Sequence, residues 1–237
     1  MRAHQVPKSA IVKRIARGGL PTKRITQRGV LAQRMLGVET KFGADSEICG
    51  EGEPIEYVYE VGRGAVRTVK VLADGRRKIS GFLFPGDIFG LQDGNDHALS
   101  AEAVVPTTVR VIKRRTLVEL AADDRHLAEE LLAMALRDVA RAHSHALMLI
   151  MTAQERVNSF LVEMGQRISV GDLVQLPMSR QDIADHLGLT IATVSRIITR
   201  LAGTSTIRLP SSRTIVLRDR SALAESSGAR LGMHFGS

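Results

Sequence analysis

The chain of 237 residues has a single cysteine, Cys49, and this scarcity excludes several kinds of protein. One cysteine cannot form a disulfide framework within the chain or supply a site that needs several thiolates. Long apolar runs are also missing, since the longest covers residues 146–151, against the roughly 18 residues that a membrane helix needs. No nucleophile, base and acid form a recognisable catalytic set, so we expect no enzyme. The sequence favours a protein of the reducing cytoplasm without a membrane segment.

Acidic residues are absent up to Arg34, where nine basic residues occur, and the rest of the chain holds 24 basic and 25 acidic residues. The formal net charge of +8 therefore belongs to this leader. A basic leader without acids is typical of an arm on nucleic acid, a transit peptide or a dispensable extension. We expect residues 1–40 to form a mostly disordered extension with a short helix near its end.

Residues 41–113 are expected to form a small β-barrel or roll. Short runs of β-branched and aromatic residues recur, and glycine-containing turns divide them. The segment from Val66 to Ser80 is typical of a hairpin with Asp74 and Gly75 at its tip. The expected strands lie within residues 57–61, 65–72, 78–84 and 107–112.

Proline and glycine are absent from Lys113 to Met164, and residues 114–152 predict a helical connector and dimerisation helix. A helix over residues 124–151 would be about 42 Å long, too long to be buried on one small domain. It carries two apolar stripes, so one can pack on its own domain and the other on a twin helix. One stripe has a polar middle that suits a tunable dimer contact. We assign this first stripe to the homodimer: Leu127, Leu131, Met134, Asp138, Arg141, His145 and Met148. The second stripe is Leu132, Ala135, Val139, Ala142, Ala146 and Leu149.

Residues 153–220 contain the most specific pattern, that of a winged helix-turn-helix. Ala184 is small where two helices must approach closely, Gly188 suits the turn, and Thr190 can cap the second helix. Two strands within residues 206–217 form the expected wing. Six arginines and only two acids between residues 180 and 218 predict a surface for phosphates and guanine edges. Residues 221–237 are expected to be a flexible tail.

Three motifs resemble the CRP/FNR family of bacterial transcription regulators, over residues 41–220. They are Gly64–Arg67 with Pro85–Gly90, the long helix, and Leu176–Thr190 with Thr193–Arg196. The resemblance is to the FNR/FixK branch. It implies an α+β chain with an N-terminal cyclic-nucleotide-binding-like β-roll, a long dimerisation helix and a C-terminal winged helix-turn-helix. It also implies a homodimer on double-stranded DNA, with RNA polymerase as a further partner and half-sites about one helical turn apart.

The same resemblance implies a set of DNA contacts. Arg196 would read guanine, Ser195 would contact a base or phosphate nearby, and Ile191 would meet thymine methyl groups. The residues implied in phosphate contact are Ser179, Arg180, Gln181, Thr199 and Arg213.

One departure concerns the recognition helix, where Ala192 replaces the family's glutamate. That glutamate accepts a hydrogen bond from cytosine, so its loss removes about 1–3 kcal/mol of discrimination at one base pair per half-site. We expect an inverted repeat of the TTGA-N6-TCAA kind, with relaxed selectivity at its G·C pair. The alternative is a variant with impaired specificity.

Other departures concern the effector. Cyclic-AMP-binding members hold the nucleotide phosphate with an Arg-Ser pair, where His97 and Ala98 stand, and Arg141 and Ala142 replace a hydroxylated pair. One cysteine cannot hold the four-cysteine iron–sulfur cluster of FNR, and the histidines form no haem or metal chelate. We expect no cofactor; an effector-gated member of the same family is the alternative. Cys49 is interpreted as a core residue or a redox switch.

Overall fold

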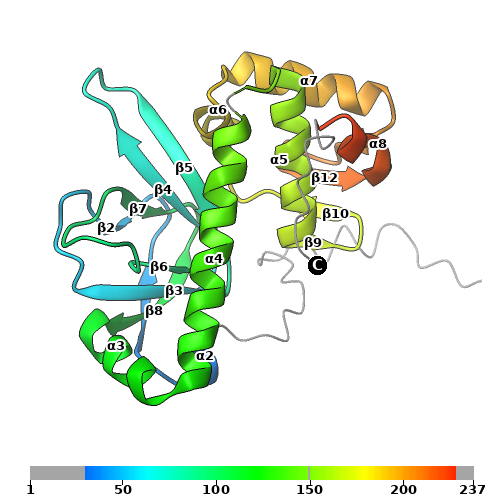
Figure 1. Ribbon diagram of the computed structural model, residues 1–237. Helices are drawn as coiled ribbons and strands as arrows, with labels where there is room; N and C mark the ends of the chain where they lie inside the picture. Colours follow the sequence, from blue (N-terminus) through cyan, green and yellow to red (C-terminus); the bar gives the residue numbers. More distant parts are fainter. Residues whose placement is uncertain (1–29, 149, 228–237) are drawn as a thin grey trace, which may run out of the picture.

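The computed structural model of the chain describes residues 30–148 and 150–227. It has an N-terminal β-roll, a long helix and a C-terminal domain (Figure 1), which confirms the predicted fold class. The roll consists of two antiparallel sheets with strand orders β1-β8-β3-β6 and β2-β7-β4-β5. The strands are β1 (Val38–Phe42), β2 (Glu47–Cys49), β3 (Tyr57–Arg63), β4 (Val66–Val71), β5 (Arg77–Leu83), β6 (Ile88–Phe89), β7 (Ser100–Ala103) and β8 (Thr107–Lys113).

Side chains that alternate inward and outward close the roll around an apolar interior. Val61 on β3 and Val109 on β8 are buried where these two strands pair. β4 and β5 pair as the expected hairpin, in which Val71 stands opposite Arg77. Gly75 takes a φ of +81° near the tip of this hairpin, a conformation that favours glycine. The hairpin prediction is confirmed.

The N-terminal helix α2 (Val30–Gln33) packs into the roll, and its first two residues are buried. The Glu60 carboxylate accepts hydrogen bonds from the backbone N–H groups of Leu31 and Ala32, at 2.9 and 3.0 Å. Because β1 also starts before residue 41, the described end of the expected extension belongs to the roll, and we correct that boundary. The expected short helix is present. Residues 1–29 lie outside the described residues.

Two helices follow the roll, α3 (Arg114–Asp123) and α4 (Arg125–Met148). Between them, the Asp124 carboxylate accepts the backbone N–H of Leu127 at 3.0 Å, which helps to start α4. α4 runs along the roll and its C-terminal end reaches the second domain (Figure 1). The long helix predicted over residues 124–151 is therefore present with slightly shorter bounds.

The first stripe of α4 lies against the chain's own domains. Leu127 is buried with α3 and the roll, and Leu131 and Met134 pack against the same cluster. Met148 is buried in the core of the second domain. We correct the assignment of this stripe to a twin helix, because its apolar ends are already covered within the chain.

Polar contacts of the same stripe lead to the same correction. Arg141 forms ion pairs with Asp138 and with Asp87 of the roll. The ring of His145 stacks on that of His186 in the second domain. The polar middle of the stripe thus serves contacts inside the protomer. The second stripe is exposed at Leu132, Ala135, Val139, Ala142 and Ala146, while Leu149 lies outside the described residues.

The C-terminal domain is built around a helix pair and a small sheet of order β11-β12-β10-β9. Residues 188–190 form the short turn between the two helices, and strands β11 and β12 pair to form the wing. Together they confirm the winged helix-turn-helix. Its elements are α5 (Ala153–Ile168), β9 (Ser169–Val170), β10 (Leu173–Gln175), α6 (Arg180–Leu187), α7 (Ile191–Gly203), β11 (Ile207–Arg208), β12 (Thr214–Leu217) and α8 (Arg220–Glu225).

Residues 221–227 are part of this domain and do not form a flexible tail. Leu223 of α8 is buried in the core that α5 also lines. The Asn158 side chain donates to the backbone oxygen of Ser226 at 3.0 Å. We therefore correct the expected tail for residues 221–227; residues 228–237 lie outside the described residues.

One apolar core joins the roll to the C-terminal domain. Phe82 and Phe84 of the roll belong to the same cluster as Phe160 and Met164 of α5. The rings of Phe82 and Phe160 meet edge to face, with centroids 6.3 Å apart. Because the two domains share buried surface, the winged helix-turn-helix is held in one place relative to the roll. None of the described helices is long and apolar enough to cross a membrane.

Candidate DNA-binding surface

The helix-turn-helix is defined by three local features. The Ser179 hydroxyl accepts a hydrogen bond from the backbone N–H of Asp182 at 3.0 Å and caps α6. The Asp182 carboxylate accepts the backbone N–H of Ser179, which completes a capping box. Gly188 ends α6 in the left-handed conformation, with φ +65°. Thr190 caps α7 by accepting the backbone N–H of Thr193 at 3.1 Å. These contacts set the angle at which α7 leaves the turn.

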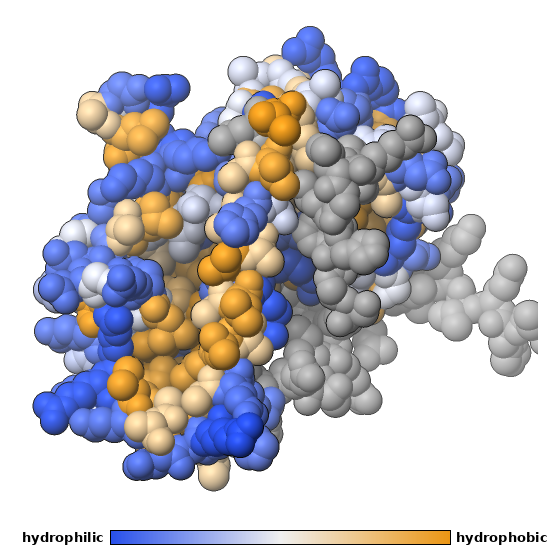
Figure 2. Space-filling view, in the orientation of Figure 1, coloured by the Kyte–Doolittle hydropathy of each residue, from blue (hydrophilic) through white to orange (hydrophobic). Residues whose placement is uncertain are grey.

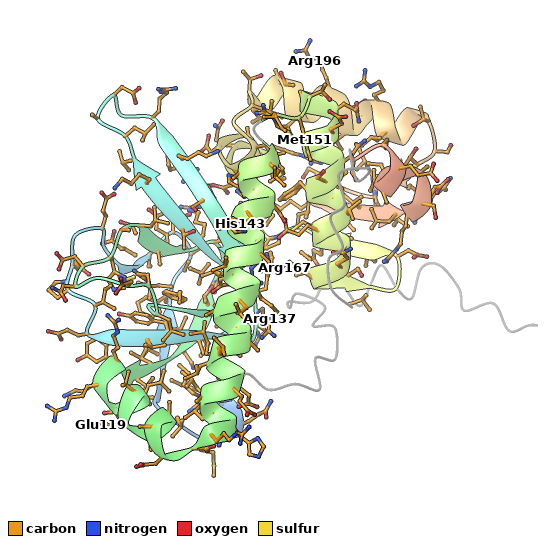
Figure 3. The ribbon with its side chains drawn as sticks, in the orientation of Figure 1. Glu119, Arg137, His143, Met151, Arg167 and Arg196 are labelled. Atoms are coloured by element: carbon orange, nitrogen blue, oxygen red, sulfur yellow. The ribbon has the colours of Figure 1, made fainter. Side chains whose placement is uncertain are left out.

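One face of α7 is buried and the other is exposed. Val194, Ile197 and Leu201 pack on the core that contains Ala184. The opposite face carries all the residues predicted for base readout, and each is exposed: Ile191, Ala192, Ser195 and Arg196, with Thr199 beside them. Figure 3 shows Arg196 pointing away from the domain at the outer side of α7.

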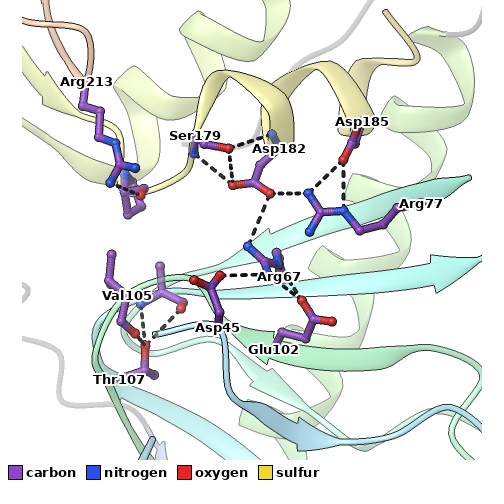
Figure 4. Close-up of polar contacts among 12 residues, drawn as sticks. Asp45, Arg67, Arg77, Glu102, Val105, Thr107, Ser179, Asp182, Asp185 and Arg213 are labelled. Atoms are coloured by element: carbon purple, nitrogen blue, oxygen red, sulfur yellow. Dashed lines mark hydrogen bonds and ion pairs between the residues drawn. The ribbon is translucent and has the colours of Figure 1, made fainter. Parts of the chain in front are cut away.

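The residues expected at phosphates are brought together in part. The Arg213 guanidinium donates to the backbone oxygen of Pro177 at 3.3 Å (Figure 4), so the wing lies beside the segment that precedes α6. Ser179 is half-buried, and its hydroxyl donates to the Asp182 carboxylate at 2.7 Å. Gln181 is exposed and donates to Asp185 at 2.6 Å. Ser179, Gln181 and Arg213 therefore share one end of the domain, whereas Thr199 belongs to the middle of α7.

Arg180 is half-buried like Ser179, but part of its guanidinium is buried without a partner in the described part of the chain. Nη1 of its guanidinium is inaccessible and has no hydrogen-bond partner among the described residues. Burial lowers the pKa of Arg180 from its ordinary value. Burying a guanidinium without a hydrogen-bond partner costs free energy. Arg180 can therefore bind a DNA phosphate only if its side chain turns outward.

Three more arginines add basic charge to the surface of the domain. Arg200, Arg208 and Arg218 are exposed on α7, on β11 and after β12. Both acids of α6, Asp182 and Asp185, are turned toward the roll instead. The sequence patterns did not reveal these partners in the roll, because the contacting residues lie more than 100 positions away in the chain. The surface left for DNA is consequently positive.

The resemblance implies that cyclic-AMP-binding members hold the nucleotide phosphate at the positions of His97 and Ala98. His97 is buried, and its Nδ1 lies 3.1 Å from the Gln92 amide and 3.8 Å from the Cys49 sulfur. Burial lowers the pKa of His97. Burial raises the pKa of the Cys49 thiol to about 11, so this thiol stays protonated at neutral pH, which supports its interpretation as a core residue. Among the described residues, no three potential metal ligands converge.

Fold and surface together define a class of protein: a DNA-binding regulator with a cyclic-nucleotide-binding-like roll. Residues 39–124 match the family of cyclic nucleotide-binding domains, and residues 155–226 match the Crp-like helix-turn-helix domain.

Named relatives narrow the class. The chain is 47% identical over 194 residues to a nitrogen fixation regulation protein FixK of Azorhizobium caulinodans, covering 79% of this chain and 78% of that protein. It is 43% identical over 178 residues to the protein of the same name from Rhizobium meliloti, covering 75% and 81%. The solved structure of FixK2 from Bradyrhizobium japonicum superposes with a TM-score of 0.77 at 46% identity, covering 80% of this chain and 96% of that one. The chain belongs to the CRP/FNR family of transcription regulators and is similar to its FixK members.

Proposed function

We propose that the chain works as a homodimer on a TTGA-N6-TCAA-like inverted repeat, and that it needs neither a cyclic nucleotide nor an iron–sulfur cluster. The observation that carries this proposal is the exposed outer face of α7, on which Ile191, Ser195 and Arg196 stand clear of the core. A helix presented in this way fits the major groove, where base edges are read. The regulator would act on cytoplasmic DNA, with RNA polymerase as a further partner that family membership implies.

Base readout would rest on Arg196, which donates two hydrogen bonds to guanine O6 and N7. Ser195 and Ile191 would contact neighbouring bases, while Thr199 and Arg213 would contact phosphates together with the start of α6. In the free protein, the Arg196 Nε donates to the backbone oxygen of Ala192, at 3.4 Å. With no carboxylate at position 192, neither the cytosine amino group nor the arginine is held by that position. We therefore expect relaxed selectivity at the G·C pair.

The second copy would dock on the exposed face of α4, which carries the second stripe and the adjacent Leu136 and is called the outer stripe. Figure 2 shows apolar side chains gathered along this helix on the face that is turned outward. Leu136 is 60% exposed and Val139 is 51% exposed. A continuous stripe of apolar side chains is seldom left exposed to water on a monomeric protein. In a parallel pair of α4 helices, the outer stripes of the two copies would bury each other. The pair would also place one α7 helix at each of the two half-sites.

Independence from a ligand is supported by the shared core and by the roll itself. Phe82 of the roll and Phe160 of α5 join the two domains through the chain's own side chains. The buried His97, bonded to Gln92, leaves no arginine fork for a nucleotide phosphate. An effector-gated member remains the rival function. A rise in Tm with a cyclic nucleotide would favour that rival, and an unchanged Tm would favour our proposal.

The deciding experiment is a binding titration without added ligand, at several salt concentrations. One duplex carries the palindrome, and a second carries an A·T pair in place of the G·C pair of each half-site. We expect the wild type, which has only Arg196 to read this pair, to prefer the palindrome weakly, and Ala192→Glu to widen that preference by about tenfold or more. Ala192→Met, similar in length but without a carboxylate, is the matched control.

Two outcomes would count against the proposal. Full discrimination by the wild type would show that Ala192 does not relax the readout. Weak binding to every duplex, lost uniformly as salt rises, would mean that only phosphate contacts operate and that specificity is impaired.

A further inference from the structure

The roll holds the first helix of the helix-turn-helix through an arginine at the start of β5 (Figure 4). Nη2 of Arg77 donates to Asp182 at 2.7 Å and to Asp185 at 2.8 Å, and its Nε donates to Asp185 at 3.0 Å. Both carboxylates belong to α6. One guanidinium of the roll thus bridges two acids that are one turn apart on a helix expected to meet DNA.

A second arginine supports the same carboxylate from the neighbouring strand. Arg67 on β4 donates to Asp182 at 3.3 Å and also to Glu102 at 2.7 Å and Asp45 at 3.0 Å. Its side chain is 8% exposed and that of Asp182 is 6% exposed. Burial acts to raise the pKa of Asp182, but hydrogen bonds from Ser179, the charge of Arg67 and a hydrogen bond from Arg77 hold it below its ordinary value. The carboxylate is therefore ionised and enclosed by partners.

The position of Asp182 connects this network to the DNA-binding surface. It is the third residue of α6 and closes the capping box with Ser179, at the turn that also carries Arg180 and Gln181. A carboxylate without a cation at this place would repel a phosphate that approaches the same turn. The arginines of the roll offset the charge of Asp182 and fix the turn at the same time.

We propose that Arg77 is a positioning residue for DNA binding: through Asp182 and Asp185 it fixes the start of α6 and offsets part of the negative charge of these two carboxylates beside the phosphate contacts. Arg67 assists through Asp182. This inference rests on the proposed contact between the start of α6 and DNA phosphates. Arg77 itself touches no base and no phosphate, so its effect on binding passes through α6.

The chain offers a matched control in the preceding residue. Arg76 carries the same charge, its side chain is 77% exposed, and its ion-pair partner is Asp74 at the hairpin tip. Arg77→Met and Arg76→Met therefore remove the same charge from the same strand end. A difference between them reports the contact with α6 and not the net charge of the protein.

The test measures the Kd of the full-length protein for the labelled palindrome and for a scrambled duplex of equal length, from low to moderate KCl. We expect Arg77→Met to weaken binding to both duplexes about tenfold at low salt, and Arg76→Met to change it less than about twofold. The defect of Arg77→Met should shrink as KCl rises, because salt screens the repulsion between carboxylate and phosphate. A partly unfolded sample would instead lose the same fraction of activity at every salt concentration.

Rescue completes the design. Arg77→Met combined with Asp185→Asn removes the unpaired carboxylate and should recover most of the lost affinity, and Arg77→Lys should recover part of it. If Arg77→Met fails to fold, these two variants carry the test alone. Equal Kd values for the Arg77 and Arg76 variants, or a loss that is independent of salt and not rescued, would overturn the proposal. Failure of the proposed operator would appear differently, as equal wild-type affinity for the palindrome and the scrambled duplex.

Discussion

The imidazole rings of His145 and His186 stack with centroids 4.5 Å apart, where α4 meets α6. Nδ1 of His186 donates to the backbone oxygen of Ile79 at 3.1 Å, whereas neither ring nitrogen of His145 has a hydrogen-bond partner among the described residues. Burial, followed by the neighbouring His145, Lys78 and Arg167, lowers the pKa of His186 to about 3. Burial also lowers the pKa of His145. The interface between helix and DNA-binding domain thus contains two neutral histidines.

This pair predicts a loss of stability in mild acid. The unfolded chain binds a proton at His186 near pH 6.5, while the folded chain resists it until about pH 3. Stability is therefore complete above pH 6.5 and falls as the pH drops toward 3, by about 2 kcal/mol at pH 5 for this one group. Urea unfolding at pH 8, 6.5 and 5 measures the slope. His186→Gln should flatten it, whereas the same change at the exposed His126 should not; equal slopes in both variants would contradict the assignment.

The outer stripe of α4 predicts the oligomeric state. A charge placed at Leu136 would be buried between two helices, so Leu136→Asp should convert the dimer to a monomer and weaken operator binding. Light scattering after size-exclusion chromatography checks the mass. Val118→Asp, at a similarly exposed position on α3, is the control and should remain dimeric. A dimeric Leu136→Asp protein would place the contact elsewhere.

Glu60 predicts the contribution of the N-terminal helix. Its buried carboxylate accepts two backbone N–H groups of α2, and the amide of Glu60→Gln can accept only one of them through its oxygen. One buried N–H then lacks a partner, at a cost of about 1–3 kcal/mol. Denaturant unfolding measures this loss, and Glu56→Gln at an exposed position is its control. An unchanged midpoint for Glu60→Gln would mean that α2 does not add to stability.

Leu223 predicts that α8 is required for the C-terminal domain. Its side chain is fully enclosed by the core, so Leu223→Ala should cost about 2–5 kcal/mol of unfolding free energy. Val170→Ala, at a half-exposed position of β9, should cost much less. Comparable losses in the two variants would show that α8 detaches readily and that the tail prediction was the better description.

The sequence alone was sufficient for the winged helix-turn-helix. Ser179, Gly188 and Thr190 act on backbone groups within a few residues of themselves, so the local sequence is enough to predict their roles. The apolar spacing of α7 likewise indicates which face is exposed, because Ser195, Arg196 and Thr199 occupy the face opposite the buried Val194, Ile197 and Leu201. The β4–β5 hairpin was predictable for the same reason, from a glycine turn between two β-branched runs.

Tertiary structure alone decided which stripe of α4 faces inward. Both stripes are apolar at helical spacing, and periodicity describes the angle between two faces without saying which one meets the roll. α8 was missed because it contributes a single buried side chain, Leu223, too little for a periodic signal. The pairing of Arg77 with Asp182 joins residues 105 positions apart, and no local pattern encodes such a contact. Contacts between neighbours in the chain follow from the sequence directly, whereas contacts between distant segments exist only once the core has brought the roll and the DNA-binding domain together.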